Sequence, residues 1–196
     1  MESTVTIRLL ENEVEVQDAY CFVRRHAHAR YDADPPPPPE ALLAAYRRGE
    51  VVGTIGVDFT AVDTGELSLE RIWSFDPANA PLPFNRQEIA QYGRWFTVEQ
   101  DVSLMLVYGA TIFARTHGKR SVLAEMKPGA ARVLERVGIA MLPIQNAQLV
   151  LENIEESGRF YYVNGPPPQL CMADLSGVED AALQRIPGLK GMNICF

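Results

Sequence analysis

The stretch that decides the fold is residues 88–139, which opens with EIAQYGRWFTV at residues 88–98. This opening run is apolar and rich in aromatic residues, as β-strands are. Apolar residues then recur at helical spacing over residues 104–114, and a second strand, SVLAEM, follows at residues 121–126. A short helix over residues 130–137 comes next, preceded by a proline and stopped by a glycine. Strand, helix, strand and helix with short connections predict a parallel βαβ unit.

Segments with the apolar spacing of helices and segments with the alternation of strands surround this unit, so the sequence predicts a mixed α/β chain. The tripeptide Ser-Gly-Val at residues 176–178 precedes Glu179, and Ser176 with Glu179 has the spacing of a capping box. The region 67–75 fits either a strand or a helix. The expected elements, in chain order, are a strand at 4–10, an arginine-rich helix at 14–31, a hairpin of 42–46 with 51–59, strands at 159–163 and 169–175, a helix at 176–186 and a loose tail at 188–196.

Two proline runs, at residues 35–39 and 166–168, cannot be helix or inner strand and predict stiff surface connectors. Neither run separates two lengths that would fold independently. We therefore expect a single domain over residues 1–196, made of an N-terminal strand, helix and hairpin (1–60), the core unit (88–139) and C-terminal strands and a helix (159–196).

The bulk composition restricts the class of protein. Of the 196 residues, 47% are hydrophobic and 22% are charged, which is typical of globular proteins. The net charge of −7 argues against general nucleic-acid binding and means that an acidic carrier protein would need a local basic patch. No apolar run reaches the roughly 20 residues of a membrane span, and the first residues lack a signal-peptide pattern, so a cytoplasmic location is expected.

Cysteine and histidine spacing predicts neither a disulfide framework nor a metal site. Cys21, Cys171 and Cys195 are odd in number and have no metal-ligand spacing, which favours reduced thiols. His26 and His28 would point to different sides of a helix, without a third ligand nearby.

Short motifs in the core unit resemble those of the GNAT acyltransferases. Residues 131–139, ARVLERVGI, resemble the helix end of that superfamily, and GEVVG at residues 49–53 resembles its hairpin. Residues 92–98, YGRWFTV, resemble the E-x-x-R-[FL]-x-V strand of one branch, which holds the acyl-homoserine-lactone synthases, the long-chain N-acyl amino acid synthases and the thermostable-haemolysin-like proteins. In element order the resemblance runs from Arg24 to Leu175. It implies an α/β (α+β) fold: one GNAT-like domain with a mixed central sheet, a splayed parallel strand pair and flanking helices.

The resemblance also implies an activity. The protein would be an N-acyltransferase that moves a fatty acyl group to the amine of an amino acid or related small metabolite, by direct attack on a thioester. No bound cofactor is implied; the donor would be acyl-phosphopantetheine on acyl-carrier protein, or acyl-CoA. The pyrophosphate loop of the acetyl-CoA enzymes is replaced by the acidic residues 99–103, EQDVS, which favours the carrier protein as donor and partner.

The same resemblance assigns candidate donor-binding residues. The groove would lie where the strand ending Phe96-Thr97-Val98 parts from the strand ending at Met126, and backbone groups of Phe96 and Val98 would pair with the pantetheine arm. The N-terminal end of a helix starting near Ser103 would face any phosphate.

Arg94 matches the arginine of the branch and would hold a carboxylate or carbonyl of the acceptor, or else pair with a nearby acid. Gln91 occupies the position where the branch usually has glutamate, and glutamine cannot take a proton. Base catalysis would then fall to water or to Glu88, which shares a face with Arg94 if the strand is regular and is otherwise a solvated charge.

The remaining candidates form two groups. Acceptor-binding residues implied by the resemblance are Arg24, Arg25, Asp32 and Asp34; Trp73 is placed with them, although it also fits an acyl tunnel or ordinary core packing. The expected carrier-docking set is Lys119, Arg120, Lys127 and Arg132.

Two other functions stay open. Gln91 in place of glutamate favours a non-catalytic GNAT-like binding module that senses an acyl thioester or a protein partner. A haemolysin-like role is disfavoured because the sequence has no membrane-active amphipathic segment. The arginine usual after the hairpin glycine is also missing, with Gly56 or Val57 in its place, which argues against a lactone-specific enzyme.

Overall fold

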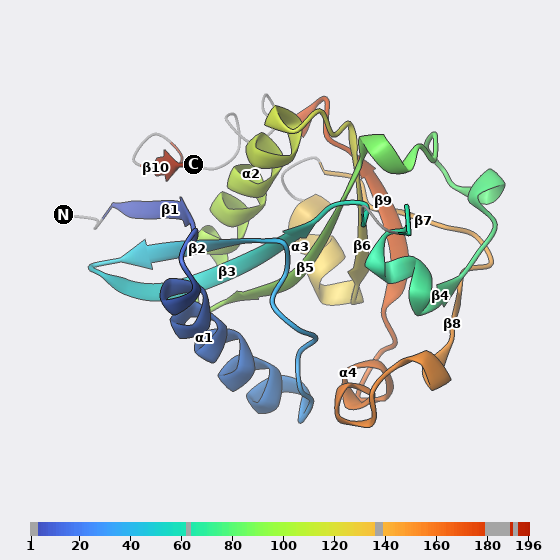
Figure 1. The fold of residues 1–196 in the computed structure, drawn as a ribbon, viewed down its shortest axis with the longest axis horizontal. Helices are drawn as coiled ribbons and strands as arrows, with labels where there is room; N and C mark the ends of the chain where they lie inside the picture. Colours follow the sequence, from blue (N-terminus) through green and yellow to red (C-terminus); the bar gives the residue numbers. More distant parts are fainter. Residues whose placement is uncertain (1–3, 62–63, 136–138, 179–188, 190–191) are drawn as a thin grey trace.

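A computed structural model describes residues 4–61, 64–135, 139–178, 189 and 192–196. It contains a mixed eight-stranded sheet in the order β10-β1-β2-β3-β5-β6-β9-β7 (Figure 1). A two-stranded sheet, β4 (Trp73–Ser74) with β8 (Gln148–Leu149), lies apart from it. The strands of the large sheet are β1 (Val5–Leu9), β2 (Ala41–Arg47), β3 (Glu50–Asp58), β5 (Ile89–Thr97), β6 (Ser121–Met126), β7 (Leu142–Pro143), β9 (Gln169–Asp174) and β10 (Asn193–Cys195).

Helices cover both faces of the sheet, as expected of the mixed α/β fold. The helices are α1 (Glu13–Tyr31), α2 (Gln100–Thr116), α3 (Pro128–Glu135) and α4 (Phe160–Val163). Alternate residues of β2 show the two faces: Leu43 packs in the core that contains α2, whereas Leu42 packs in the core that contains α1. None of the described helices is long and apolar enough to cross a membrane.

The predicted core unit is confirmed. Strand β5, helix α2 and strand β6 form a parallel unit, and β2 with β3 form the predicted hairpin. Helix α2 is buried on most of its surface because it packs against the sheet. Helix α1 begins where the Asn12 side chain accepts a bond of 2.8 Å from the Glu15 amide, and it ends at Asp32 in a left-handed conformation.

The expectations for the rest of the chain had mixed outcomes. Residues 160–163 form a helical turn and not a strand, because Tyr161 and Tyr162 pack against Tyr31 and Glu125, so tertiary contacts override their β propensity. Within the expected loose tail, Asn193–Cys195 form β10, which pairs in parallel with β1. The ambiguous region 67–75 contains a 3₁₀ turn, η1 (Ser68–Arg71), followed by β4. Most of the predicted helix at 176–186 lies outside the described residues.

Strands β5 and β6 part after four paired residues. Their pairing runs from Ile89 opposite Ser121 to Tyr92 opposite Ala124 and then stops, although both strands continue. Beyond that point β5 stays bonded to β3, and β6 stays bonded to β9. The predicted splayed pair is therefore confirmed.

A β-bulge accompanies the splay. Gly93 pairs with Gly56 and Phe96 with Thr54, so Arg94 and Trp95 together oppose the single residue Ile55 of β3. Arg94 takes a left-handed backbone conformation with φ of 49°. Because an extra residue bends the strand that carries it, the bulge bends β5 just beyond the point where its pairing with β6 ends.

The proline run at residues 35–39 is a connector without helix or strand, as predicted. It passes over β3, where Gly56 leaves room for Pro39. A Cβ atom at Gly56 would lie 2.8 Å from Cγ of Pro39 and 3.2 Å from Cδ of Arg94.

Gly56→Ala should therefore lower the free energy of unfolding by about 1–3 kcal/mol, because the stiff proline ring must move. Its pairing partner gives a matched control: a Cβ at Gly93 meets no atom within 4 Å, so Gly93→Ala should cost less than about 0.5 kcal/mol. Urea denaturation of both variants measures the difference. Equal costs would contradict the close packing of Pro39 on β3.

Candidate functional site

A cavity of about 570 Å³ opens where β5 and β6 part. It is lined from both faces of the sheet. The side toward α2 and α3 is apolar and includes Val107, Val122, Ala124, Met126, Ala130 and Leu134. The side toward α1 and η1 carries the polar residues Ser68, Arg71, Gln91, Arg94, Glu125 and Asp34. The cavity thus passes through the sheet from an apolar compartment to a polar one.

The bulge determines on which side Arg94 lies. In a regular strand, residues 91 and 94 would point to opposite faces. Tyr92 packs in the α2 core, whereas Gln91 and Arg94 both reach Asp58. The extra residue therefore brings Arg94 to the polar side with Gln91.

Arg94 pairs with a nearby acid. Its Nη1 lies 2.5 Å from Oδ2 of Asp58, and its Nη2 donates to the carbonyl of Pro37 at 2.8 Å. Both side chains of the ion pair are mostly buried, with 10% and 14% of their surface exposed. The guanidinium charge is therefore compensated within the protein, and it fixes the proline connector against the end of β3.

Gln91 is buried and its amide is fully engaged. Its Oε1 accepts a bond of 2.8 Å from the Leu69 amide, and its Nε2 donates to Oγ of Ser68 at 2.6 Å. These bonds attach η1 to β5. Gln91 therefore holds one wall of the cavity in place.

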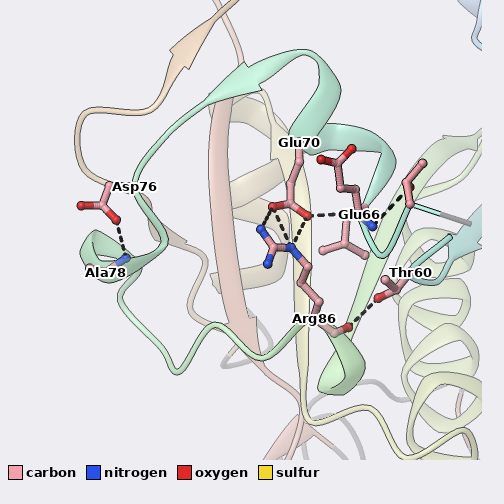
Figure 2. A network of polar contacts seen from close by, with 8 residues as sticks. Thr60, Glu66, Glu70, Asp76, Ala78 and Arg86 are labelled. Atoms are coloured by element: carbon pink, nitrogen blue, oxygen red, sulfur yellow. Dashed lines mark hydrogen bonds and ion pairs between the residues drawn. The ribbon is translucent and has the colours of Figure 1, made fainter. Parts of the chain in front are cut away.

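A second set of bonds fixes the other side of η1. Arg86 donates Nε and Nη2 to the Glu70 carboxylate at 2.9 and 2.7 Å, and Glu70 also accepts from the Leu67 amide (Figure 2). Thr60, which follows β3, donates its hydroxyl to the Arg86 carbonyl at 2.7 Å. The wall that carries Ser68 and Arg71 is thus braced from two directions.

Glu125 is a site residue that sequence reasoning missed. It follows Ala124, the last residue of β6 that pairs with β5, and it lines the cavity. Trp73 donates Nε1 to its Oε1 at 2.6 Å, and Tyr162 donates its hydroxyl to its Oε2 at 3.1 Å. Burial raises the pKa of Glu125 to about 7. The one available signal was a carboxylate inside the apolar run SVLAEM.

Glu88 lies away from the cavity. It ends the 3₁₀ turn η3 (Arg86–Glu88) before β5, and its carboxylate is 3.9 Å from Arg120. Glu88 was expected to share a face with Arg94 only if the strand is regular, and that condition is not met, because the bulge interrupts β5 and Glu88 lies in η3 before the strand. Six residues of strand also separate the two positions by about 20 Å.

The structure brings two members of the candidate donor set to the cavity, Phe96 and Met126. Thr97, Val98 and Ser103 do not line it. The Val98 amide donates to the Val52 carbonyl at 3.1 Å, so this N–H is not free to pair with a pantetheine arm as expected. Helix α2 begins at Gln100 and not near Ser103.

The start of α2 carries acidic groups that are already paired. Arg47 of β2 forms ion pairs with Glu99 and Asp101, the latter at 3.0 Å. Two carboxylates at this helix end disfavour a pyrophosphate there, because its charge would meet theirs.

The acceptor set is only partly assembled. Asp34 lines the cavity and pairs with Nε2 of His28 at 2.9 Å, and Trp73 reaches the site through Glu125. The other members, Arg24, Arg25 and Asp32, are exposed and do not line the cavity.

The expected carrier-docking residues do not form one patch. Lys119 and Arg120 precede β6, whereas Lys127 and Arg132 follow it, and the six-residue strand separates the pairs by about 20 Å. Lys127 lines the cavity, where its Nζ lies 4.9 and 4.8 Å from the ring centres of Tyr31 and Tyr161.

Asp58→Asn should lower the free energy of unfolding by about 3 kcal/mol, because it leaves the buried Arg94 charge without its carboxylate. Glu88→Gln is the control: it breaks the solvent-exposed contact with Arg120 and should cost less than about 0.5 kcal/mol. Denaturant unfolding at pH 7 gives both values. A small cost for Asp58→Asn would show that the Arg94–Asp58 pair does not hold this wall.

Comparison with known proteins agrees with this geometry. No protein-family model and no curated protein sequence matches the chain. Solved structures do match. BjaI, a CoA-dependent acyl-homoserine-lactone synthase, aligns over 97% of this chain and 93% of its own with a TM-score of 0.64 and 17% identity. The synthase LasI aligns over 94% and 97% with a TM-score of 0.63 and 9% identity.

A third match is FeeM, an N-acyl amino acid synthase from uncultured soil microbes, which aligns over 97% of this chain and 99% of its own with a TM-score of 0.60 and 12% identity. At these identities the shared property is the arrangement of the chain in space. The protein has the GNAT-type fold of the acyl-homoserine-lactone and N-acyl amino acid synthases.

Proposed function

We propose that the protein is an N-acyltransferase that moves a fatty acyl group from a thioester to the amine of an amino acid or related small metabolite. One observation carries the proposal: a single cavity crosses the sheet at the splay and joins an apolar compartment to a polar one. Its volume of about 570 Å³ falls in the range of roughly 300–1,000 Å³ that is usual for ligand sites.

Each compartment suits one reactant. The fatty chain fits the apolar side, where Ala124, Met126 and Ala130 offer apolar surface. The thioester carbonyl would lie in the gap, where β5 beyond Tyr92 has no ladder bonds to β6. The amine would approach from the side of Glu125 and Asp34. Because both reactants would be held at the same gap, their proximity would accelerate the direct attack of the amine on the thioester carbonyl.

The donor that fits best is acyl-phosphopantetheine on a carrier protein. Glu99 and Asp101, paired with Arg47, occupy the helix end that would have to receive a CoA pyrophosphate. On the cavity side of β6, Lys127 and Arg132 supply positive charge that an acidic carrier could approach.

A non-catalytic binding module is the second candidate function. It is favoured by Gln91, whose amide is hydrogen-bonded to η1 and cannot accept a proton as a base. Such a module would bind acyl thioesters in the same cavity without consuming them.

The test is to incubate the purified protein with acyl-carrier thioesters and acyl-CoAs of graded chain length and with a set of amino acids and small amines. Mass spectrometry should detect an acyl amide and an equal amount of free thiol, faster from the carrier protein than from CoA. Thioester binding without amide formation would support the binding module. No binding and no product across the set would overturn both.

A substitution in α3 tests where the acyl chain lies. Ala130 lines the cavity, and Ala130→Leu should shorten the longest acyl chain used by about two to four carbons, because each excluded methylene loses ~0.8 kcal/mol of burial. Ala131, its half-buried neighbour outside the cavity, gives the control: Ala131→Leu should leave the chain-length profile unchanged. Profiles that shift together would contradict this placement of the acyl chain.

A further inference from the structure

Acyl transfer to an amine needs a group that takes a proton from the attacking nitrogen. Gln91, at the position where a carboxylate was expected, cannot do so, and Glu88 is outside the cavity. Among the described residues that line the cavity, three carry a carboxylate: Asp34, Glu125 and Glu155.

Two of these carboxylates are poorly placed. Asp34 is half-exposed and bonded to His28, and Glu155 lies on an exposed segment of the rim. Glu125 lies inside, directly past the last paired residue of β6, at the gap where a thioester carbonyl would be held.

The groups around Glu125 hold the carboxylate in one orientation. Trp73 of β4 donates to one oxygen at 2.6 Å, and Tyr162 of α4 donates to the other at 3.1 Å. Arg94 of β5 and Tyr161 of α4 also act on it electrostatically. Burial raises the pKa of Tyr161 and of Tyr162, so both hydroxyls keep their protons. Of this cluster, only the Glu125 carboxylate can accept a proton near neutral pH.

We propose that Glu125 is the catalytic base of the acyl transfer, with Trp73 and Tyr162 as its positioning residues; this rests on the proposed function. Glu125 takes one proton from the substrate ammonium. The nitrogen lone pair then attacks the thioester carbon, the C–N bond forms and the C–S bond breaks. The second nitrogen proton leaves with the thiolate, which departs as the thiol. Glu125 returns its proton to solvent before the next turnover.

The surroundings of Glu125 set the pH at which it works. Burial raises its pKa to about 7, while the bonds from Trp73 and Tyr162 lower it because they stabilise the carboxylate. Deprotonated Glu125 is the active form, so kcat/KM should rise with pH to a plateau above about 7.

The experiment compares pH profiles of kcat/KM for the wild type, Glu125→Gln and Trp73→Phe, with an acceptor whose amine pKa lies well above 9. The wild type should show an acidic limb near pH 7. Glu125→Gln should lose this limb and lower kcat by about 10²–10⁴-fold, with the KM for the thioester nearly unchanged. Trp73→Phe keeps an aromatic ring but removes the Nε1–H donor, so its limb should move to higher pH.

Glu152→Gln changes an exposed carboxylate that does not line the cavity and is the control; both its kcat/KM and the acidic limb of its pH profile should stay as in the wild type. A Glu125→Gln variant that keeps the limb overturns the assignment while the proposed function stands. Trp73→Phe also overturns the proposal if it lowers kcat/KM but leaves the acidic limb at the wild-type pH. A residue that only supports the fold would give that result. A wild type that forms no amide overturns the proposed function and this proposal together.

Discussion

The site depends on a competition between hydrogen-bond partners along two strands. Past Tyr92 and Ala124, β5 and β6 each keep an outer neighbour, β3 and β9, and give up each other. Backbone groups that face the gap have lost their ladder partner, and buried peptide groups of this kind need water or a ligand. The sheet thus creates a place where an amide-bearing molecule can restore the missing bonds.

The alternation of side chains along a strand then gives the gap two chemically different sides. On β6, Ala124 and Met126 point to the apolar core, while Glu125 between them points to Trp73. The bulge adds Arg94 to the polar side. The alternation along this one strand therefore places the apolar compartment and the polar compartment that contains Glu125 on opposite sides of β6.

Much of this could be predicted from the sequence. The spacing of apolar residues and the turn residues were enough to predict the βαβ unit and the hairpin, since those signals are local. The bulge was not predictable, because Arg94 adopts a backbone conformation for which its residue type gives no sign. Glu125 was missed because its partners Trp73 and Tyr162 are far away in the sequence. The helical turn of α4 was read as a strand because its aromatic residues favour strands when considered without their contacts.

The backbone and the side chain of Arg94 favour different residue types at this position. Its left-handed backbone, with φ of 49°, is a conformation that glycine adopts freely and that costs other residues on the order of 1–3 kcal/mol. Its side chain, however, holds Asp58 and the carbonyl of Pro37, which glycine could not do. No single residue type satisfies both demands. This position is therefore a compromise, in which the chain accepts local strain so that the bend in the strand and the anchor of the proline connector come from the same amino acid.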